Sequence, residues 1–185
     1  DDEQTIENFR KQFKSNTKLV ICTHASNVFG IKLPIERIGA LCRLNGILFC
    51  VDAAQSAGTA DINLSDSCID FLCTAGHKGL YGPMGTGLLI INSETTPDSL
   101  IQGGTGSDSA NLNQPEILTD KYESGTPNLQ GIAGLNAGIK FVLNKKTDRI
   151  YNSELSLAQM LYKRLEKAEN VILYTKMPEK SHSVP

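Results

Sequence analysis

Two short stretches of this sequence combine residue types that could do chemistry together. An aspartate and a glutamine stand close to one another at Asp52 and Gln55, and a histidine and a lysine are adjacent at His77 and Lys78. A lysine amine can bond covalently to an aldehyde, and a carboxylate can keep a ring nitrogen protonated. The amide and the imidazole can donate hydrogen bonds to further oxygen atoms of a ligand.

These four side chains match the needs of one cofactor, pyridoxal 5'-phosphate (PLP). Its aldehyde requires a lysine, its ring nitrogen a carboxylate, and its phenolic oxygen and phosphate require hydrogen-bond donors. Each residue also has an ordinary interpretation when it is taken alone. An aspartate after a strand is commonly a turn residue or cap, and a glutamine or a glycine-flanked lysine is commonly a solvated surface group. The combination, in this order, favours a cofactor site.

The segments that must position these residues alternate between apolar runs and amphipathic stretches. Apolar runs that predict buried strands lie at residues 19–22, 47–51, 69–73 and 88–91. A helix is predicted from Pro34 onward, where apolar residues recur at helical spacing. This alternation predicts an α/β fold with a mostly parallel sheet. Ligands of such sheets bind at the carboxyl ends of the strands, which is where Asp52 and Lys78 stand.

The remaining segments are predicted from the same patterns. Two amphipathic helices are expected after Pro127, the first through Val142 and the second through Leu165. The run 171–174 is predicted to begin a strand, and the polar segment 92–126 is too long for a simple connection. Segments of that kind are commonly functional or disordered.

Composition narrows the classes of protein that this sequence could belong to. The 185 residues are 40% hydrophobic and 21% charged, which is enough for one globular domain with a core. A net charge of −2 argues against a nucleic-acid or anionic-membrane partner. No apolar run is long enough to span a bilayer, and the acidic start is unlike a signal peptide, so a cytoplasmic location is predicted.

The five cysteines are an odd number and most of them lie in apolar runs, which favours free thiols in a reducing compartment. Cys22 with His24 lacks the second pair of ligands that a zinc site needs, so no metal site is predicted. Cys50 and Cys73 are placed inside strands, where a thiolate is poorly stabilised. None of these thiols is therefore predicted to accept sulfur.

Five segments, in order, resemble the class V aminotransferase family of PLP enzymes, and most of all its cysteine desulfurase and selenocysteine lyase branch. They are residues 26–30 (SNVFG), 51–58 (VDAAQSAG), 76–87 (GHKGLYGPMGTG), 103–107 (GGTGS) and 123–128 (ESGTPN). The resemblance implies the large domain of a three-layer PLP-dependent transferase (fold type I), in a fragment of a longer chain. It implies the PLP-binding large domain over 1–143, and a connecting helix with the start of a small C-terminal domain over 144–185.

The resemblance also implies a role for each matching residue. Lys78 would bind the cofactor through a Schiff base and later move the substrate proton. Asp52 would pair with the pyridine nitrogen, and Gln55 would hydrogen-bond the phenolic oxygen. Asn27 would lie near that oxygen or the substrate carboxylate, and His77 would reach the phosphate.

Two further assignments are less direct. Gly104 and Thr105 would reach the phosphate of a neighbouring subunit's cofactor, because the family forms homodimers with shared sites. Ala75 stands where many members carry a serine or threonine that binds phosphate, so either Thr74 replaces it or the phosphate loses a ligand.

The implied reaction is conversion of L-cysteine or selenocysteine to alanine, with transfer of the sulfur to an enzyme thiol and, from there, to an acceptor protein. A transaminase or another PLP lyase on the same scaffold is one alternative, and a non-catalytic assembly or regulatory domain is another. The family's first phosphate loop would precede Asp1, and its substrate arginine and persulfide cysteine would follow Pro185, so this fragment alone is expected to be inactive. Nucleotide binding is disfavoured, because residues 82–87 do not form G-x-G-x-x-G and have no Walker lysine.

Overall fold

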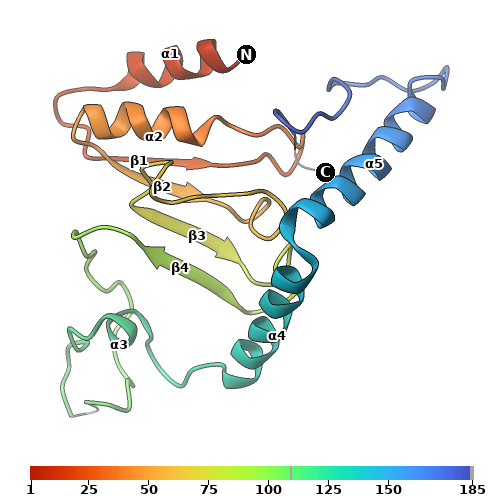
Figure 1. The fold of residues 1–185 in the computed structure, drawn as a ribbon. Helices are drawn as coiled ribbons and strands as arrows, with labels where there is room; N and C mark the ends of the chain where they lie inside the picture. The colour runs from red at the N-terminus through yellow and green to blue at the C-terminus, as the bar shows by residue number, and fades with distance from the viewer. Residues whose placement is uncertain (109, 184–185) are drawn as a thin grey trace.

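The structure is a computed structural model that describes residues 1–108 and 110–183 (Figure 1). Its elements, in chain order, are α1 (Asp2–Gln12), β1 (Leu19–Thr23), α2 (Ile35–Leu44), β2 (Leu48–Asp52), β3 (Phe71–Ala75), β4 (Gly87–Ile91), α3 (Leu118–Tyr122), α4 (Leu129–Lys145) and α5 (Thr147–Leu165). The strands predicted at 19–22, 47–51, 69–73 and 88–91 are all present, with ends that differ by one or two residues.

The four strands form one sheet in the order β1-β2-β3-β4. The first three are parallel, and β4 runs antiparallel to β3. The direction of β4 follows from its connection, because residues 76–86 contain no crossover helix that could return the chain to the other end of the sheet. The prediction of a mostly parallel sheet is confirmed.

Helix α2 covers one face of the sheet, and α1 lies over α2 (Figure 1). Ile35 and Ile38 of α2 are fully buried against Phe49 and Val51 of β2. Each such side chain contributes about 2 kcal/mol on leaving water. Helix α1 adds Ile6 to the same core, and Asp1 caps it by accepting a hydrogen bond from the Gln4 backbone N–H at 2.8 Å.

The opposite face of the sheet is largely exposed in the described chain. Side chains alternate along β1 and β2, so that Val20, Phe49 and Val51 point towards α2 while Ile21 points away from it. Ile21 is 67% exposed. Because Asp52 directly follows Val51, its carboxylate lies on the face away from α2.

Helices α4 and α5 run past the carboxyl ends of the parallel strands (Figure 1). The Asn128 side chain caps α4 by accepting a hydrogen bond from the Gly131 backbone N–H at 3.0 Å. Lys146, with φ at 68°, separates α4 from α5. The division of domains predicted between residues 143 and 144 therefore falls in the last turn of α4, and the break in the helix comes just after it.

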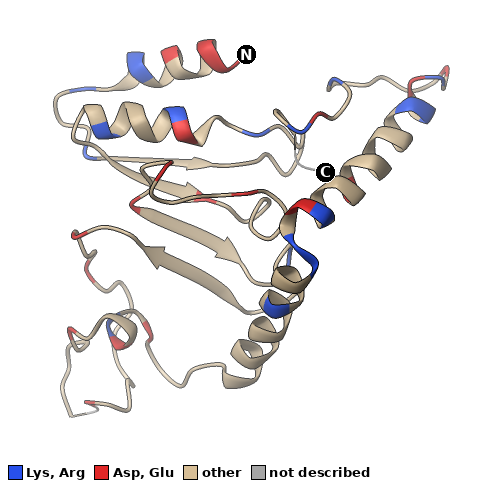
Figure 2. Cartoon of the chain, in the orientation of Figure 1, with Lys and Arg blue, Asp and Glu red and all other residues tan. Residues whose placement is uncertain are grey.

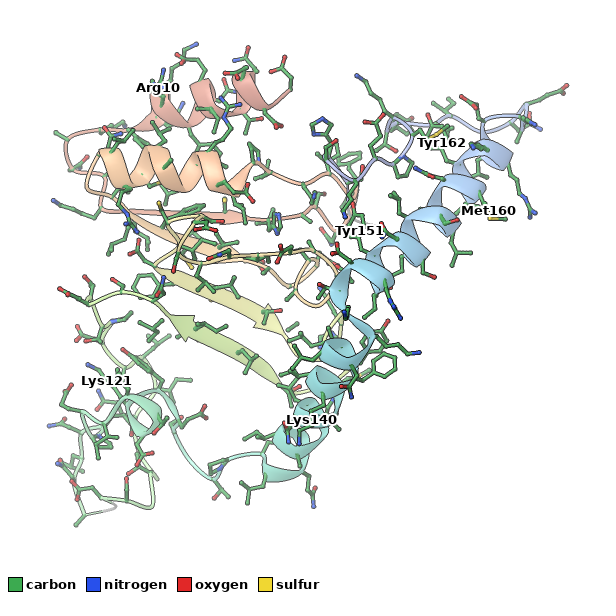
Figure 3. All side chains as sticks on the ribbon, in the orientation of Figure 1. Arg10, Lys121, Lys140, Tyr151, Met160 and Tyr162 are labelled. Atoms are coloured by element: carbon green, nitrogen blue, oxygen red, sulfur yellow. The ribbon has the colours of Figure 1, made fainter. Side chains whose placement is uncertain are left out.

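The strand predicted at residues 171–174 is wrong, because this segment is irregular. Ile172 is 76% exposed and Tyr174 is 83% exposed, and no strand in the described ranges pairs with them. A strand needs a partner for its backbone groups, so a short apolar run without one does not form it. The chain then returns to α5, where Tyr151 donates hydrogen bonds to the carbonyls of Lys180 and Ser183 (Figure 3).

Charged side chains of both signs lie mainly on the helices and loops, and the strands carry almost none (Figure 2). Asp52 is the one charged residue within the four strands of the described chain. Within residues 1–108 and 110–183, none of the helices is both long enough and apolar enough to cross a membrane.

Candidate cofactor site

The carboxyl ends of the three parallel strands bring polar residues to one edge of the sheet. Thr23 pairs with Asp52 across β1 and β2, and Asp52 pairs with Cys73 across β2 and β3. Backbone hydrogen bonds continue this register beyond the strands, because the His24 N–H donates to the Asp52 carbonyl at 2.8 Å and the Ala53 N–H donates to the Cys73 carbonyl at 2.8 Å. The loops that follow the strands therefore start from fixed positions.

Asp52 is the last residue of β2, and its carboxylate is exposed. One carboxylate oxygen accepts a hydrogen bond from the Ala54 backbone N–H at 2.9 Å. This contact fixes the side chain in a tight turn but leaves the second oxygen without a protein donor in the described chain. A fixed, accessible carboxylate at this edge fits a protonated ring nitrogen.

Gln55 is half-buried in the turn that follows β2, next to the fully buried Ser56. The Ser56 N–H donates to the Ala53 carbonyl at 3.0 Å, and the Ser56 carbonyl accepts from the Ala60 N–H at 2.7 Å. Ser56 is thus anchored to the core, while the neighbouring Gln55 keeps an accessible amide. The turn presents Gln55 on the same segment as Asp52.

His77 and Lys78 are exposed in the turn that follows β3. Two backbone hydrogen bonds close this turn: the Tyr81 N–H donates to the Lys78 carbonyl at 2.9 Å, and the Gly82 N–H donates to the Gly76 carbonyl at 2.8 Å. The closure requires Tyr81 to adopt a positive φ of 56°, which is unusual for a bulky residue. Strain of this kind is common at functional sites.

The turns that carry Gln55 and Lys78 are in direct backbone contact. A β-carbon added to Gly58 would overlap with the carbonyl of Gly79, and one added to Gly79 would overlap with the carbonyl of Ala57. Glycine is therefore required on both sides of this contact. The structure brings together the Asp52–Gln55 segment and the Lys78 turn, as the sequence predicts.

Helix α4 supports the Lys78 turn from outside the sheet. A β-carbon on Gly138 would overlap with the carbonyl of Leu80, and one on Gly134 would lie 3.0 Å from Pro83. Tyr81 packs edge-to-face on Phe141 of the same helix, with ring centroids 5.1 Å apart. The sequence did not lead us to expect that Gly134 and Gly138 form a packing face on α4. The spacing of these glycines in a helical segment was the signal that could have predicted it.

Asn27 is exposed in the loop after β1. The Ser26 hydroxyl accepts hydrogen bonds from the backbone N–H groups of Val28 and Phe29, each at 3.2 Å, and Gly30 closes the loop with φ at 64°. The loop starts one strand away from Asp52, at the same edge of the sheet. Its position agrees with the predicted role of Asn27, which stays a prediction.

Thr74 is not brought to the Asp52 face. Cys73 pairs with Asp52, so the next side chain along β3 points to the α2 side of the sheet. Thr74 is 8% exposed, and its hydroxyl donates to the Ala53 carbonyl at 3.4 Å. Its predicted role as a phosphate ligand finds no support in this geometry.

Gly104 and Thr105 lie in a separate region. The segment 92–128, green to teal in Figure 1, lies away from the carboxyl ends of β1 to β3 until it reaches α4. The buried side chain of Gln114 organises it, because its oxygen accepts from the Gly103 N–H at 2.8 Å and its nitrogen donates to the Asp120 carbonyl at 2.8 Å. The structure does not bring Gly104 or Thr105 to Lys78 within one chain.

Three cysteines packed in β1, α2 and β2 are poor nucleophiles. Burial raises the pKa of Cys22 to about 12 and that of Cys42 to about 11. Burial and the neighbouring Cys73 raise the pKa of Cys50 to about 11. The described chain contains no group of three or more His, Cys, Asp or Glu residues placed to hold a metal ion.

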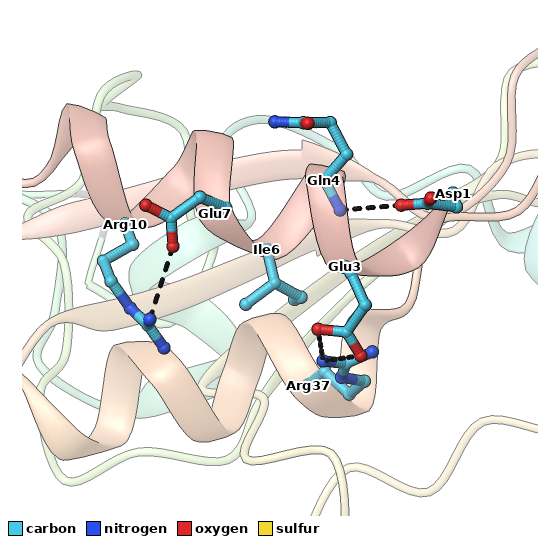
Figure 4. A pocket seen from close by; sticks show the side chains of 7 residues that line it. All are labelled: Asp1, Glu3, Gln4, Ile6, Glu7, Arg10 and Arg37. Carbon is cyan, nitrogen blue, oxygen red and sulfur yellow. Dashed lines mark hydrogen bonds and ion pairs between the residues drawn. The ribbon is translucent and has the colours of Figure 1, made fainter.

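A surface hollow of about 350 Å³ lies between α1 and α2, away from the Lys78 turn (Figure 4). Its walls carry the ion pair between Glu3 and Arg37 at 2.9 Å and the contact between Arg10 and Glu7 at 3.3 Å. Exposed pairs of this kind contribute little to stability. The hollow is best explained as the solvated seam between two helices.

Comparison with known proteins agrees with the geometry. The model of the family "Aminotransferase class-V" matches residues 1–184. A probable cysteine desulfurase of Pyrococcus abyssi is 36% identical over 178 residues, which are 91% of this chain and 43% of that protein. A cysteine desulfurase of Salmonella newport is 32% identical over 174 residues, again 91% of this chain and 43% of that protein.

Solved structures show the same relationship. The apo structure of a cysteine desulfurase from Thermococcus onnurineus matches with a TM-score of 0.81 and 36% identity, over 96% of this chain and 45% of that one. A cysteine desulfurase from Escherichia coli matches with a TM-score of 0.76 and 25% identity, over 88% of this chain and 42% of that one. The chain thus spans less than half the length of these relatives, and it belongs to the class V aminotransferase family, whose members depend on PLP.

Proposed function

We propose that this chain binds PLP at the carboxyl edge of β1 to β3 and that Lys78 is its covalent anchor. The observation that carries the proposal is the backbone contact between Gly58 and Gly79, which locks the Asp52–Gln55 segment against the Lys78 turn. A covalent anchor and a ring-nitrogen carboxylate must be held in fixed relation, and this contact holds their two segments together.

Each residue has a defined task in this proposal. Bound PLP supplies an electron sink for the bonds around the substrate α-carbon. The Asp52 carboxylate keeps the ring nitrogen protonated, and the Gln55 amide hydrogen-bonds the phenolic oxygen. The Lys78 amine moves the substrate proton once it is free. His77 binds the phosphate, and Asn27 lies near the phenolic oxygen or the substrate carboxylate.

We propose that the reaction is desulfuration of L-cysteine to L-alanine. The proteins that this chain resembles are named cysteine desulfurases, and one matching structure is titled as a complex with cysteine. The carbon–sulfur bond breaks, the sulfur atom passes to an enzyme thiolate to give a persulfide, and the remaining carbon accepts a proton. Because the pKa values of Cys22, Cys42 and Cys50 are raised, we place that thiol elsewhere in the protein.

The proposal extends to the oligomeric state, the sulfur acceptor, the domain division and the cellular location. We propose a homodimer in which Gly104 and Thr105 reach the neighbouring subunit's cofactor, and a protein that accepts the persulfide sulfur. We also propose the large domain over 1–143, the start of a small domain over 144–185, and a cytoplasmic location, which suits the free thiols.

The test is covalent trapping of the cofactor. The full-length protein is mixed with PLP, reduced with borohydride and digested, and the modified peptide is mapped by mass spectrometry. We expect a phosphopyridoxyl group on Lys78 and none on Lys140, an exposed lysine of α4. The variant Lys78→Ala should lose the label, and the matched variant Lys140→Ala should keep it.

A separate sample of the full-length protein, loaded with PLP and not treated with borohydride, is given L-cysteine and a thiol reductant that releases persulfide sulfur as sulfide, and alanine, sulfide and keto acid are measured. Alanine with sulfide supports the desulfurase. Keto acid formed only with an added amino acceptor would indicate the transaminase instead. A protein without a Schiff-base absorbance band and without a label on Lys78 would contradict the proposal and favour the non-catalytic alternative.

A further inference from the structure

A buried histidine lies beneath the proposed site and has no task in it. His24 is 4% exposed, whereas His77 is exposed. Its ring nitrogen Nδ1 lies 2.8 Å from the hydroxyl oxygen of Ser56, which is fully buried. A hydrogen bond between two buried side chains is costly to lose, because water cannot reach either group to replace it.

The pair joins two segments that carry site residues. The His24 backbone is fixed at both sides, since its N–H donates to the Asp52 carbonyl at 2.8 Å and its carbonyl accepts from the Leu33 N–H at 2.8 Å. His24 thus stands between the end of β2 and the return of the loop that holds Asn27. Ser56 follows Gln55 directly.

The side-chain hydrogen bond therefore gives the turn a second connection to His24. One connection runs from the His24 N–H to the Asp52 carbonyl, and the other from the imidazole to the Ser56 hydroxyl. The segment from Asp52 to Ser56, which includes Gln55, is held at both of its ends by the same residue.

The charge state of His24 agrees with this arrangement. Burial, together with the nearby Lys32, lowers the pKa of His24 to about 4, so the ring is neutral near pH 7. A neutral imidazole has one donor and one acceptor nitrogen, and either can serve a hydroxyl group. The described chain has no buried side-chain nitrogen or oxygen that lacks a hydrogen-bond partner, so the interior around the pair is fully satisfied.

We propose that the hydrogen bond between His24 and Ser56 positions Asp52 and Gln55 for the cofactor ring. His24 and Ser56 are positioning residues, since they act through Asp52 and Gln55. This inference rests on the proposed PLP site and adds to it a support on the side of the turn away from the ligand. Small losses of position at such groups lower cofactor affinity and rate together.

The test compares four variants of the full-length protein. Ser56→Ala and His24→Leu remove the bond. His24→Asn keeps a polar group near the place of Nδ1. Ser67→Ala is the control, because it removes another buried hydroxyl, in a segment whose backbone packs against Gly39 of α2. The measurements are PLP affinity from fluorescence quenching, the absorbance maximum of bound PLP, and hydrogen exchange of the peptide 52–57 without PLP.

We expect Ser56→Ala and His24→Leu to weaken PLP binding about tenfold, to shift the absorbance maximum and to speed exchange in 52–57. His24→Asn should recover most of the affinity, and Ser67→Ala should match the parent. Parental PLP affinity and absorbance in Ser56→Ala, with only a lower melting temperature, would overturn the inference. If the parent itself bound no PLP, the proposed function would fail instead, and the exchange data alone would decide whether the pair holds the turn.

Discussion

The two glycine-rich regions of this chain are built in different ways. At the Lys78 turn, Gly58, Gly79 and Gly138 let backbones touch, and added β-carbons would overlap with neighbouring carbonyls. In the 92–126 segment, Gly103 and Gly106 have positive φ angles but nothing within 4 Å of an added β-carbon. The first region uses glycine mainly for close packing, whereas Gly103 and Gly106 in the second serve chain direction.

This difference shows which region is organised by its own chain. The Lys78 turn is complete within one subunit, because strands, turn and α4 hold one another. Gln114 holds the 92–126 segment through hydrogen bonds to Gly103 and Asp120, and this segment lies away from that edge (Figure 1). In the proposed dimer, a site built from both regions would use a second copy of the chain.

The largest expected effect comes from Asp52→Asn. The change is nearly isosteric, so the fold should remain, but the ring nitrogen loses its charged partner and turnover should fall on the order of a hundredfold or more. Steady-state kinetics with L-cysteine and the far-UV circular dichroism spectrum measure the two effects. Turnover equal to that of the parent would show that Asp52 does not serve the ring nitrogen.

The packing difference predicts the next largest effect. Gly138→Ala should force the Lys78 turn away from α4, with a loss of about 1–3 kcal/mol in the free energy of unfolding and slower attachment of PLP to Lys78. Asn136→Ala, on the exposed face of the same helix, is the control and should leave both unchanged. Denaturant unfolding and the rate at which the cofactor absorbance band appears provide the measurements. Equal behaviour of the two variants would contradict the packing argument.

His24 adds a pH dependence to the organised region. Its folded pKa of about 4 lies below the ordinary value of 6.5, so the unfolded chain binds the extra proton first as the pH falls. The contribution of neutral His24 to the free energy of unfolding is therefore fully present above pH 6.5. It is lost as the pH falls from 6.5 to about 4, on the order of 3 kcal/mol in total. His24 lines a second hollow of about 220 Å³, whose charged residues are Asp2, Lys32, Glu36, Arg37 and Asp61.

Urea unfolding at a series of pH values measures this loss. The variant His24→Asn has no imidazole and should lose less stability over the same interval, while the other charged residues stay in place. The same pH slope in both proteins would assign the effect to those residues instead.

The sequence was sufficient for the sheet and for the residues at its edge. Apolar runs predicted the four strands, and the motifs around Asp52 and Lys78 predicted which strand ends carry polar groups. Pairing partners are not visible in a local pattern, which is why residues 171–174 were wrongly predicted as a strand. The direction of Thr74 and the His24–Ser56 bond also depend on register between strands, so only the structure could provide them.

The smallest expected effect tests the shared site directly. Thr105→Ala removes one phosphate contact in the proposed dimer, so PLP affinity should fall a few-fold, about 1 kcal/mol, with little change in stability. Mixing this protein with Lys78→Ala by unfolding and refolding together gives mixed dimers. If Thr105 serves the neighbouring subunit, the intact Lys78 in a mixed dimer faces an intact Thr105 from the other chain. A class of sites with parental PLP affinity should then appear in the titration.

The opposite arrangement gives a different result. If Thr105 served its own subunit, every chain with Lys78 in the mixture would still lack Thr105, and no site of parental affinity could form. Parental affinity in Thr105→Ala alone would show that the residue does not contact the cofactor at all. General damage from refolding would lower the affinity in either case, so it cannot imitate a recovery. The titration therefore decides whether the 92–126 segment serves the Lys78 site of its own chain or that of its neighbour.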